Sequence, residues 1–204
     1  MRSCLVTVGP IGTNCYLVYL EDVRRLFIID PGADAPKILA ETARFPEAEK
    51  FDILLTHAHV DHIGAAGAVA RELKIGAAML DPADWELYRS PYNELLPFLP
   101  AAEDLPEVCD FATDGLFTAL DVPGHSPGSR AFFFDRGGCR ALFCGDTLFS
   151  GSIGRTDLPG GDYDTLINSI RTRLFSLPRL TPVFPGHGEG TTIGRELANN
   201  PYLK

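Results

Sequence analysis

Thr56-His57-Ala58-His59-Val60-Asp61-His62 stands directly after an apolar run, residues 51–55, that predicts a buried strand. These seven residues hold three of the five histidines in the chain. The other two occur in Pro123-Gly124-His125-Ser126 and Pro185-Gly186-His187-Gly188, each beyond a further apolar run. Five histidines used as ordinary polar residues would be scattered over surfaces and turns. Their placement indicates one site assembled at the ends of strands.

A carboxylate follows the same pattern, because Asp146 comes one residue, Gly145, after the apolar run 141–144. His57 and His59 lie two residues apart in a turn and can reach one ion, whereas a helix that begins at Asp61 and His62 turns those side chains toward a neighbouring position. We therefore expect two metal ions, with Asp146 bridging them. The expected ligands are His57, His59 and His125 for one ion, and Asp61, His62 and His187 for the other.

The donor types restrict the metal and the kind of site. Nitrogen and carboxylate donors suit divalent Zn, Fe or Mn, and we expect Zn²⁺ in the first place. Three protein ligands per ion leave a coordination position for water, which is typical of catalytic sites and not of closed structural ones.

The cysteines predict no disulfide framework. They are odd in number and form no CxxC pair, which favours a reducing, cytoplasmic location. The alternative is that Cys144 is a metal ligand, since it lies near Asp146. In an extended strand these two side chains share a face. The thiol would reach a metal only if the strand ended early.

Length and composition restrict the class of protein. The 204 residues fit one domain, 1–204, and 45% hydrophobic with 22% charged residues is ordinary for a globular protein. The net charge of -9 and only four lysines disfavour nucleic-acid binding, which needs a clustered basic surface. No apolar window approaches a membrane span, and no secretory signal opens the chain. We expect a small-molecule partner, no membrane association, and a monomer or homodimer.

Strand-like and helix-like segments alternate along the chain. Two strand-rich halves, each with helices, suggest two sheets packed face to face with helices outside. The irregular segment 89–107 carries four prolines. The expected strands are 4–8, 14–20, 25–30, 51–56, 75–80, 115–122, 130–135, 140–144 and 182–184, and the expected helices are 36–44, 63–73, 82–88, 164–174 and 196–200.

The motifs resemble those of the metallo-β-lactamase-fold hydrolases, and within them the short, glyoxalase II-like branch of hydroxyacylglutathione hydrolases. The resemblance covers essentially the whole chain. It implies an α+β, four-layer αββα sandwich of two mixed sheets, with a binuclear centre in the cleft between the sheets. It rests on Thr-His-Ala-His-Val-Asp-His, Pro-Gly-His-Ser-Pro-Gly, Gly-Asp-Thr-Leu-Phe, Pro-Gly-His-Gly and the later Thr192-Ile193-Gly194-Arg195-Glu196.

This resemblance implies a mechanism. A hydroxide bridging two ions attacks a carbonyl, and the metal stabilises the oxyanion. Asp61 is expected to orient that hydroxide. Asp30, at the end of the strand 25–30, either holds a ligand imidazole from behind or serves only in a turn.

Thioester hydrolysis is the least demanding reaction for such a site, because a thiolate leaves unaided whereas an amine needs a proton. We expect cleavage of S-(2-hydroxyacyl)glutathione to a 2-hydroxy acid and glutathione. Arg155 is the expected substrate-binding residue for the glutathione portion, unless it only pairs with Asp157 or Asp162. Two features depart from full-length glyoxalase II: the sequence stops before a C-terminal helical domain, and Glu189 replaces a tyrosine.

Other functions fit the same residues. A persulfide dioxygenase would use one iron held by His57, His125 and Asp146. A different small ester or lactone hydrolase would share the whole ligand set, whereas β-lactamases of this fold usually have a different second-site set. A non-enzymatic reading is a metal-binding module in which segment 89–107 recruits a partner.

Overall fold

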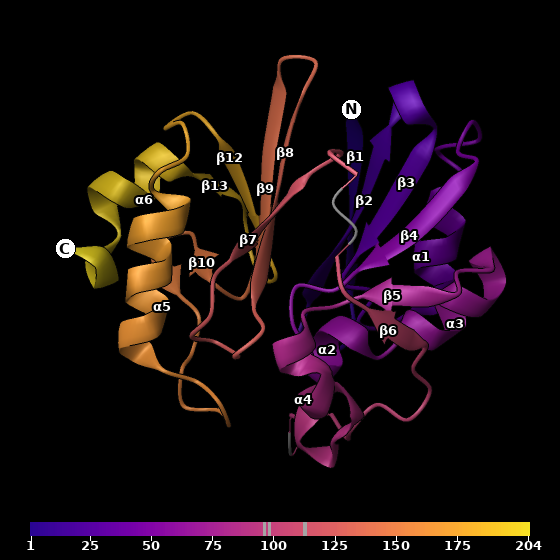
Figure 1. The fold of residues 1–204 in the computed structure, drawn as a ribbon, viewed down its shortest axis with the longest axis horizontal. Coiled ribbons are helices and arrows are strands. Elements are labelled where there is room, and N and C mark those ends of the chain that lie inside the picture. Colours follow the sequence, from indigo (N-terminus) through magenta and orange to yellow (C-terminus); the bar gives the residue numbers. More distant parts are fainter. Residues whose placement is uncertain (96, 98, 112–113) are drawn as a thin grey trace. The chain divides into compact units, whose positions relative to one another are not determined.

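The computed structural model describes residues 1–95, 97, 99–111 and 114–204. They form two compact units, an N-terminal unit, Met1–Phe111, and a C-terminal unit, Ala112–Lys204 (Figure 1). Each unit contains one large mixed sheet and its own helices. The single domain 1–204 stays a prediction. So does the role of segment 89–107, in which residues 96 and 98 lie outside the described part.

The sheet of the N-terminal unit has the order β1-β2-β3-β4-β5-β6. The pairs among β1, β2 and β3 are antiparallel and those from β3 to β6 are parallel. The strands are β1 Arg2–Val8, β2 Thr13–Leu20, β3 Arg25–Ile29, β4 Lys50–Leu54, β5 Ala77–Met79 and β6 Glu107–Cys109. The helices are α1 Ala35–Thr42, α2 Val60–Ile63, α3 Ala66–Leu73 and α4 Trp85–Arg89, with 3-10 turns η1 Glu21–Val23, η2 Pro82–Asp84 and η3 Pro91–Asn93.

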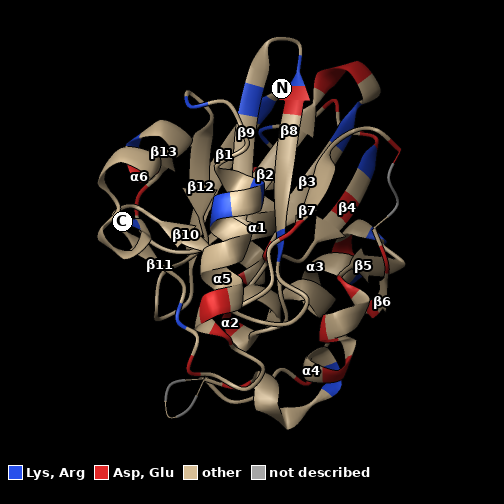
Figure 2. Ribbon diagram, turned by 60° about the vertical axis from the view of Figure 1, so that its left-hand side comes forward, with Lys and Arg blue, Asp and Glu red and all other residues tan. Residues whose placement is uncertain are grey.

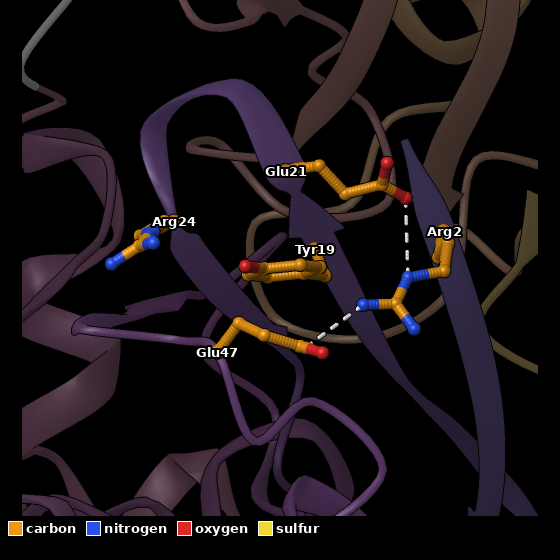
Figure 3. Close-up of a pocket in the computed structure, with 5 residues that line it drawn as sticks. All are labelled: Arg2, Tyr19, Glu21, Arg24 and Glu47. Atoms are coloured by element: carbon orange, nitrogen blue, oxygen red, sulfur yellow. Dashed lines mark hydrogen bonds and ion pairs between the residues drawn. The ribbon is translucent and has the colours of Figure 1, made fainter.

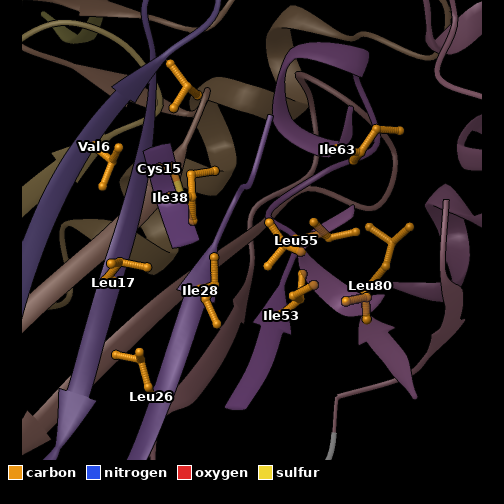
Figure 4. Packing of buried hydrophobic residues seen from close by; sticks show 14 of the residues in the cluster. Val6, Cys15, Leu17, Leu26, Ile28, Ile38, Ile53, Leu55, Ile63 and Leu80 are labelled. Atoms are coloured by element: carbon orange, nitrogen blue, oxygen red, sulfur yellow. The ribbon is translucent and has the colours of Figure 1, made fainter. Parts of the chain in front are cut away.

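Alternate residues of these strands build the core of the N-terminal unit (Figure 4). Leu17 of β2 and Ile28 of β3 pack with Ile38 of α1 and Val69 of α3, all of them buried. The opposite faces of β2 and β3 are buried as well, Phe27 among them, whereas the second face of β1 is exposed. Burial on both faces explains why β2 and β3 read as nearly continuous apolar runs.

The sheet of the C-terminal unit has the order β13-β12-β9-β8-β7, and β10 and β11 form a separate hairpin. Strands β9 and β12 are parallel and the other pairs are antiparallel. The strands are β7 Thr118–Asp121, β8 Arg130–Arg136, β9 Cys139–Gly145, β10 Leu148–Phe149, β11 Ser152–Ile153, β12 Pro182–Pro185 and β13 Thr191–Thr192. The helices are α5 Tyr163–Ser169, which continues as the π-turn η4 Ile170–Leu174, and α6 Ile193–Asn199, followed by the 3-10 turn η5 Pro201–Leu203.

The C-terminal sheet has two chemically different faces. Leu142 and Val183 pack with Leu166 of α5 in one aliphatic cluster. The other face carries phenylalanines in mutual contact, such as Phe143 and Phe184, whose rings stack with centroids 5.1 Å apart. The period-2 alternation along β8 and β9 produces this division.

Parallel pairing brings the candidate ligands of each unit to one sheet edge. In the N-terminal unit, Asp30 N–H donates to Leu54 O at 3.0 Å, so Asp30 lies beside the end of β4. In the C-terminal unit, Gly186 N–H donates to Gly145 O at 2.9 Å, which places the residues after β9 and β12 together. In the C-terminal unit, Asp146 and His187 follow the neighbouring parallel strands β9 and β12, whereas the three histidines of the N-terminal unit all follow one strand, β4.

Charged residues of both signs are distributed along the described chain. In the view of Figure 2 the lysines and arginines are scattered singly along the ribbon and interspersed with acidic residues. Within the described residues, we find no helix with the length and apolar character that a membrane crossing requires.

A buried carboxylate ties three segments of the C-terminal unit together. Glu196 of α6 is 1% exposed and accepts hydrogen bonds from Gly151 N at 2.9 Å, Thr191 Oγ1 at 2.5 Å and Asn200 Nδ2 at 2.9 Å. Asn200 Nδ2 also donates to Ser152 O at 2.9 Å. The loop of the β10–β11 hairpin is therefore anchored to β13 and α6 through one side chain.

Replacing Glu196 by alanine is expected to lower the free energy of unfolding by about 2–3 kcal/mol, because two buried donors, Thr191 and Asn200, and the partly buried Gly151 N–H lose their acceptor. Urea unfolding measures the change. Glu196→Gln keeps the volume and one carbonyl oxygen, and should cost less than alanine. Equal stability of the alanine variant and the wild type would contradict the anchoring role.

Candidate metal centre

Three histidines gather in the loop and short helix after β4. The rings of His57 and His59 meet edge to face with centroids 4.8 Å apart, and those of His57 and His62 lie 4.1 Å apart. All three side chains are buried, and so is Asp61. As expected from the sequence, Asp61 and His62 fall in a helix, α2, that begins at Val60.

Asp30 holds the loop and one imidazole of this cluster in place through hydrogen bonds. Its carboxylate accepts hydrogen bonds from Thr56 N at 2.7 Å, Thr56 Oγ1 at 2.6 Å and His62 Nδ1 at 2.9 Å. The residue is 2% exposed and has a left-handed backbone, with φ of 52°. Of the two readings of Asp30, the one in which it holds an imidazole is the one observed in the N-terminal unit.

The hydrogen bonds fix which ring nitrogen of two histidines carries the proton. His62 Nδ1 faces a carboxylate oxygen of Asp30, which can only accept, so Nδ1 donates. Thr56 Oγ1 gives its proton to Asp30 and therefore accepts from His57 Nδ1, 3.0 Å away. Both rings then present the lone pair of Nε2, the tautomer that binds a metal.

Asp61 completes the donor set of the N-terminal unit. Its Oδ2 accepts a hydrogen bond from Thr13 Oγ1 at 3.0 Å and lies 3.3 Å from His62 Nε2. A carboxylate oxygen and an imidazole nitrogen this close together are donor atoms that suit a divalent cation.

Two residues of this cluster were missed from the sequence. Asp84 is fully buried and its Oδ2 accepts a hydrogen bond from Ala58 N at 3.1 Å, which fixes the backbone between His57 and His59. Thr13 holds Asp61 as described. Each is separated by more than 25 residues in the sequence from the residue that it contacts, and no local motif indicates either one.

The C-terminal unit brings the other three predicted ligands together, with Asp146 close to both His125 and His187. Oδ2 of Asp146 lies 3.8 Å from His125 Nε2 and 3.5 Å from His187 Nε2. His125 Nδ1 donates to Arg155 O at 2.8 Å, so its Nε2 also presents a lone pair. The carboxylate of Asp146 therefore lies close to both imidazole nitrogens.

Arg155 has a role that the sequence did not predict, because its backbone carbonyl positions His125. Its guanidinium forms a bidentate pair with Asp157, with both contacts at 2.8 Å. The guanidinium lowers the pKa of Asp157 to about 2. The side chains are 57% and 69% exposed, so this pair lies in solvent.

Cys144 lies away from the carboxylate of Asp146. Strand β9 ends at Gly145, whose φ is 49°, so the extended geometry that would place both side chains on one face is broken there. The Cys144 thiol donates to Leu148 O at 3.2 Å and belongs to the aliphatic cluster of the C-terminal unit. It acts as a small buried hydrophobe.

Gly154 packs directly against the backbone of Asp146. A Cβ at Gly154 would lie 1.8 Å from Asp146 O and 3.5 Å from the Cβ of His125. The Gly154→Ala variant must therefore displace the residue between the two histidines. We expect activity to fall about 100-fold, since displacement of a reacting group by about 1 Å has that effect.

Steady-state kinetics at saturating metal measures this loss. Gly76→Ala is the matched control, because nothing lies within 4 Å of the added carbon. Activity of Gly154→Ala within twofold of Gly76→Ala would show that the fit at Asp146 is not critical.

With this geometry in place, comparison with known proteins identifies the class. The family model of the metallo-β-lactamase superfamily matches residues 8–187, and the chain belongs to that superfamily. Its members are generally metal-dependent hydrolases. The α+β fold expected from the motifs, with two large mixed sheets and helices, is confirmed.

Three individual proteins of this superfamily are similar to the chain over essentially its whole length. The chain is 35% identical to the hydroxyacylglutathione hydrolase GloC of Haemophilus influenzae, over 100% of this chain and 98% of the relative. The crystal structure of the BLEG-1 B3 metallo-β-lactamase matches with a TM-score of 0.86 and 36% identity, over the full length of both chains. The di-iron-bound form of TTHA1623 matches with a TM-score of 0.81 and 39% identity, over 98% of this chain and 100% of that one.

Proposed function

We propose that this protein hydrolyses thioesters at a binuclear metal centre, with S-(2-hydroxyacyl)glutathione as the substrate class. The observation that carries the proposal is the locked set of imidazoles: hydrogen bonds at Nδ1 leave the Nε2 lone pairs of His57, His62 and His125 as donors. Full-length similarity to GloC supports the choice of acyl thiol.

The two clusters would share two divalent ions, for which Zn²⁺ is our first choice and Fe or Mn²⁺ the alternatives. His57, His59 and His125 would hold one ion, and Asp61, His62 and His187 the other, with Asp146 bridging. When bound, such ions lower the pKa of a water molecule toward about 7 and polarise a carbonyl oxygen. The nitrogen and oxygen donors of both clusters fit these metals.

The residues of the chain supply orientation. Asp61, held by Thr13, accepts a hydrogen bond from the attacking water and aims its lone pair at the thioester carbonyl. Asp30 keeps His62 in one tautomer throughout, and Arg155 O does the same for His125. The thiolate leaves without a proton donor, so no sixth histidine is needed.

Arg155 is the proposed contact for a carboxylate of the glutathione portion. Its pair with Asp157 is solvent-exposed, and exposed pairs contribute only about 0–1 kcal/mol. A substrate carboxylate can therefore replace Asp157 at little cost.

A second candidate function is β-lactam hydrolysis, which the full-length match to the BLEG-1 enzyme favours. The amide nitrogen of a β-lactam must acquire a proton as it leaves, and all five histidines are already assigned to metal. Persulfide oxidation at a single iron is the third, and the di-iron form of TTHA1623 keeps iron in consideration.

One set of assays separates the three. Protein reconstituted with Zn²⁺, Mn²⁺ or Fe²⁺ is offered S-D-lactoylglutathione, a chromogenic cephalosporin, or glutathione persulfide with an oxygen electrode. We expect thioester turnover to exceed the other two by a wide margin and to stop on chelation. Cephalosporin turnover or oxygen uptake alone would replace the proposal with the corresponding function.

A further inference from the structure

A pocket beside His187 carries a negative charge of its own. It has a volume of about 350 Å³ and is lined by Phe149, Ser150, His187, Gly188 and Glu189. All five residues belong to the C-terminal unit. The rings of Phe149 and His187 lie with centroids 6.4 Å apart, so an apolar ring and a proposed metal ligand share the wall.

The walls of this pocket are fixed by the buried carboxylate of Glu196. Phe149 and Ser150 come from the β10–β11 hairpin, whose Gly151 N–H donates to Glu196. Gly188 and Glu189 precede β13, whose Thr191 hydroxyl donates to the same carboxylate. Both walls are therefore held by one buried side chain.

The charge in the pocket is not neutralised by its own lining. Glu189 is exposed and, within the described residues, makes no ion pair or hydrogen bond. A pocket of the N-terminal unit shows the contrast (Figure 3). There Arg2 contacts Glu21 at 3.1 Å and Glu47 at 3.2 Å, and lies over the ring of Tyr19. Both glutamates of that lining are therefore paired with an arginine of the same lining.

We propose that the Glu189 pocket binds an alkylammonium group of the thioester substrate, which in a glutathione thioester is the ammonium group of the γ-glutamyl part. This rests on the proposed thioesterase function and names the substrate class more closely. The carboxylate of Glu189 attracts the cation, the face of Phe149 adds a cation–π contact, and the hydroxyl of Ser150 accepts a hydrogen bond where N–H is present. An anionic group would be repelled.

A pair of isosteric thioesters tests the proposal. One is S-lactoylthiocholine, and the other is the S-lactoyl ester of 3,3-dimethylbutane-1-thiol, in which carbon replaces the charged nitrogen. Thiol release is followed for the metal-loaded wild type, Glu189→Gln and Glu72→Gln. Glu72 is an exposed glutamate of α3 and serves as the matched control.

We expect the wild type and Glu72→Gln to prefer the charged ester by about fivefold in kcat/KM, a typical effect of one exposed ion pair. Glu189→Gln should lose that preference, and high salt should weaken it in the wild type. An unchanged preference in Glu189→Gln, or no preference in the wild type, would overturn the assignment.

A binding measurement keeps the two proposals distinguishable. Calorimetric titration with choline and with neutral 3,3-dimethylbutan-1-ol needs no turnover. Choline binding that is lost in Glu189→Gln would support the pocket even if neither ester were hydrolysed, in which case only the thioesterase proposal fails. Equal affinity of both variants for choline would refute the pocket assignment.

Discussion

Replacing Asp146 by alanine is expected to reduce kcat/KM for the thioester at least about 10³-fold, because the proposed bridge between the two ions is lost. Its Oδ2 lies within 3.8 Å of His125 Nε2 and 3.5 Å of His187 Nε2. Without this anion, each proposed ion would keep only its own three ligands, and the shared negative charge between them would be lost. Bound metal, measured by mass spectrometry after dialysis, should fall from two equivalents to one or fewer.

Asp135→Ala is the matched control for that experiment. Asp135 belongs to the same unit and pairs with Arg140 at 2.9 Å on the surface. This variant should keep both ions and full activity. Retention of two equivalents of metal and of activity within tenfold by Asp146→Ala would refute the bridging assignment.

The second large effect is expected at Asp30. The Asp30→Asn variant keeps the shape of the side chain and a residue type that tolerates left-handed backbone. It replaces one acceptor oxygen with a donor, and that NH₂ group must face either Thr56 or His62 Nδ1–H. We expect metal affinity to fall about 10–100-fold, the usual effect of removing such a support.

The same substitution should destabilise the metal-free protein by about 2–3 kcal/mol, since buried donors lose their acceptor. Metal titration and urea unfolding in chelator measure the two effects separately. Asp34→Asn is the control, because Asp34 has the same φ of 52° but is exposed and its carboxylate accepts a hydrogen bond from Gly9 N at 3.0 Å, away from the histidines. If both variants bound metal equally, the contact to His62 would be irrelevant to the centre.

The strand-end pattern made much of each cluster predictable. Ligand-type residues that follow apolar runs come together because β3 with β4, and β9 with β12, run parallel and end at the same edge. The start of α2 was predictable for a similar reason, since a turn of small and polar residues follows β4. These signals are local in the sequence and depend only on periodicity.

Other features depend on contacts between distant residues. The short strands β6 and β13 and the hairpin of β10 and β11 contain only two or three residues each, too few for a periodic signal. The helix expected at 63–73 was wrong at its start, because α2 ends at Ile63 and α3 begins at Ala66. The support of the Ala58 backbone by Asp84 has no counterpart in any motif.

The sequence alone also left open whether Cys144 is a metal ligand, because the answer depends on the local backbone geometry. The sequence allowed its thiol to reach a metal only if the strand ended early, and although β9 does end at Gly145, the thiol donates to Leu148 O instead. A second cysteine, Cys15, is also fully buried, and burial raises the pKa of its thiol well above the ordinary value. Composition alone could not distinguish such thiols from ligands.

X-ray absorption of the zinc-loaded full-length protein tests the central claim most directly, since it reports the ligands and the neighbouring ion together. We predict nitrogen and oxygen ligands only, with a second zinc about 3.5–4 Å away. A zinc–sulfur distance of about 2.3 Å, or the absence of a metal–metal contribution at full loading, would contradict a binuclear centre built from these histidines and aspartates.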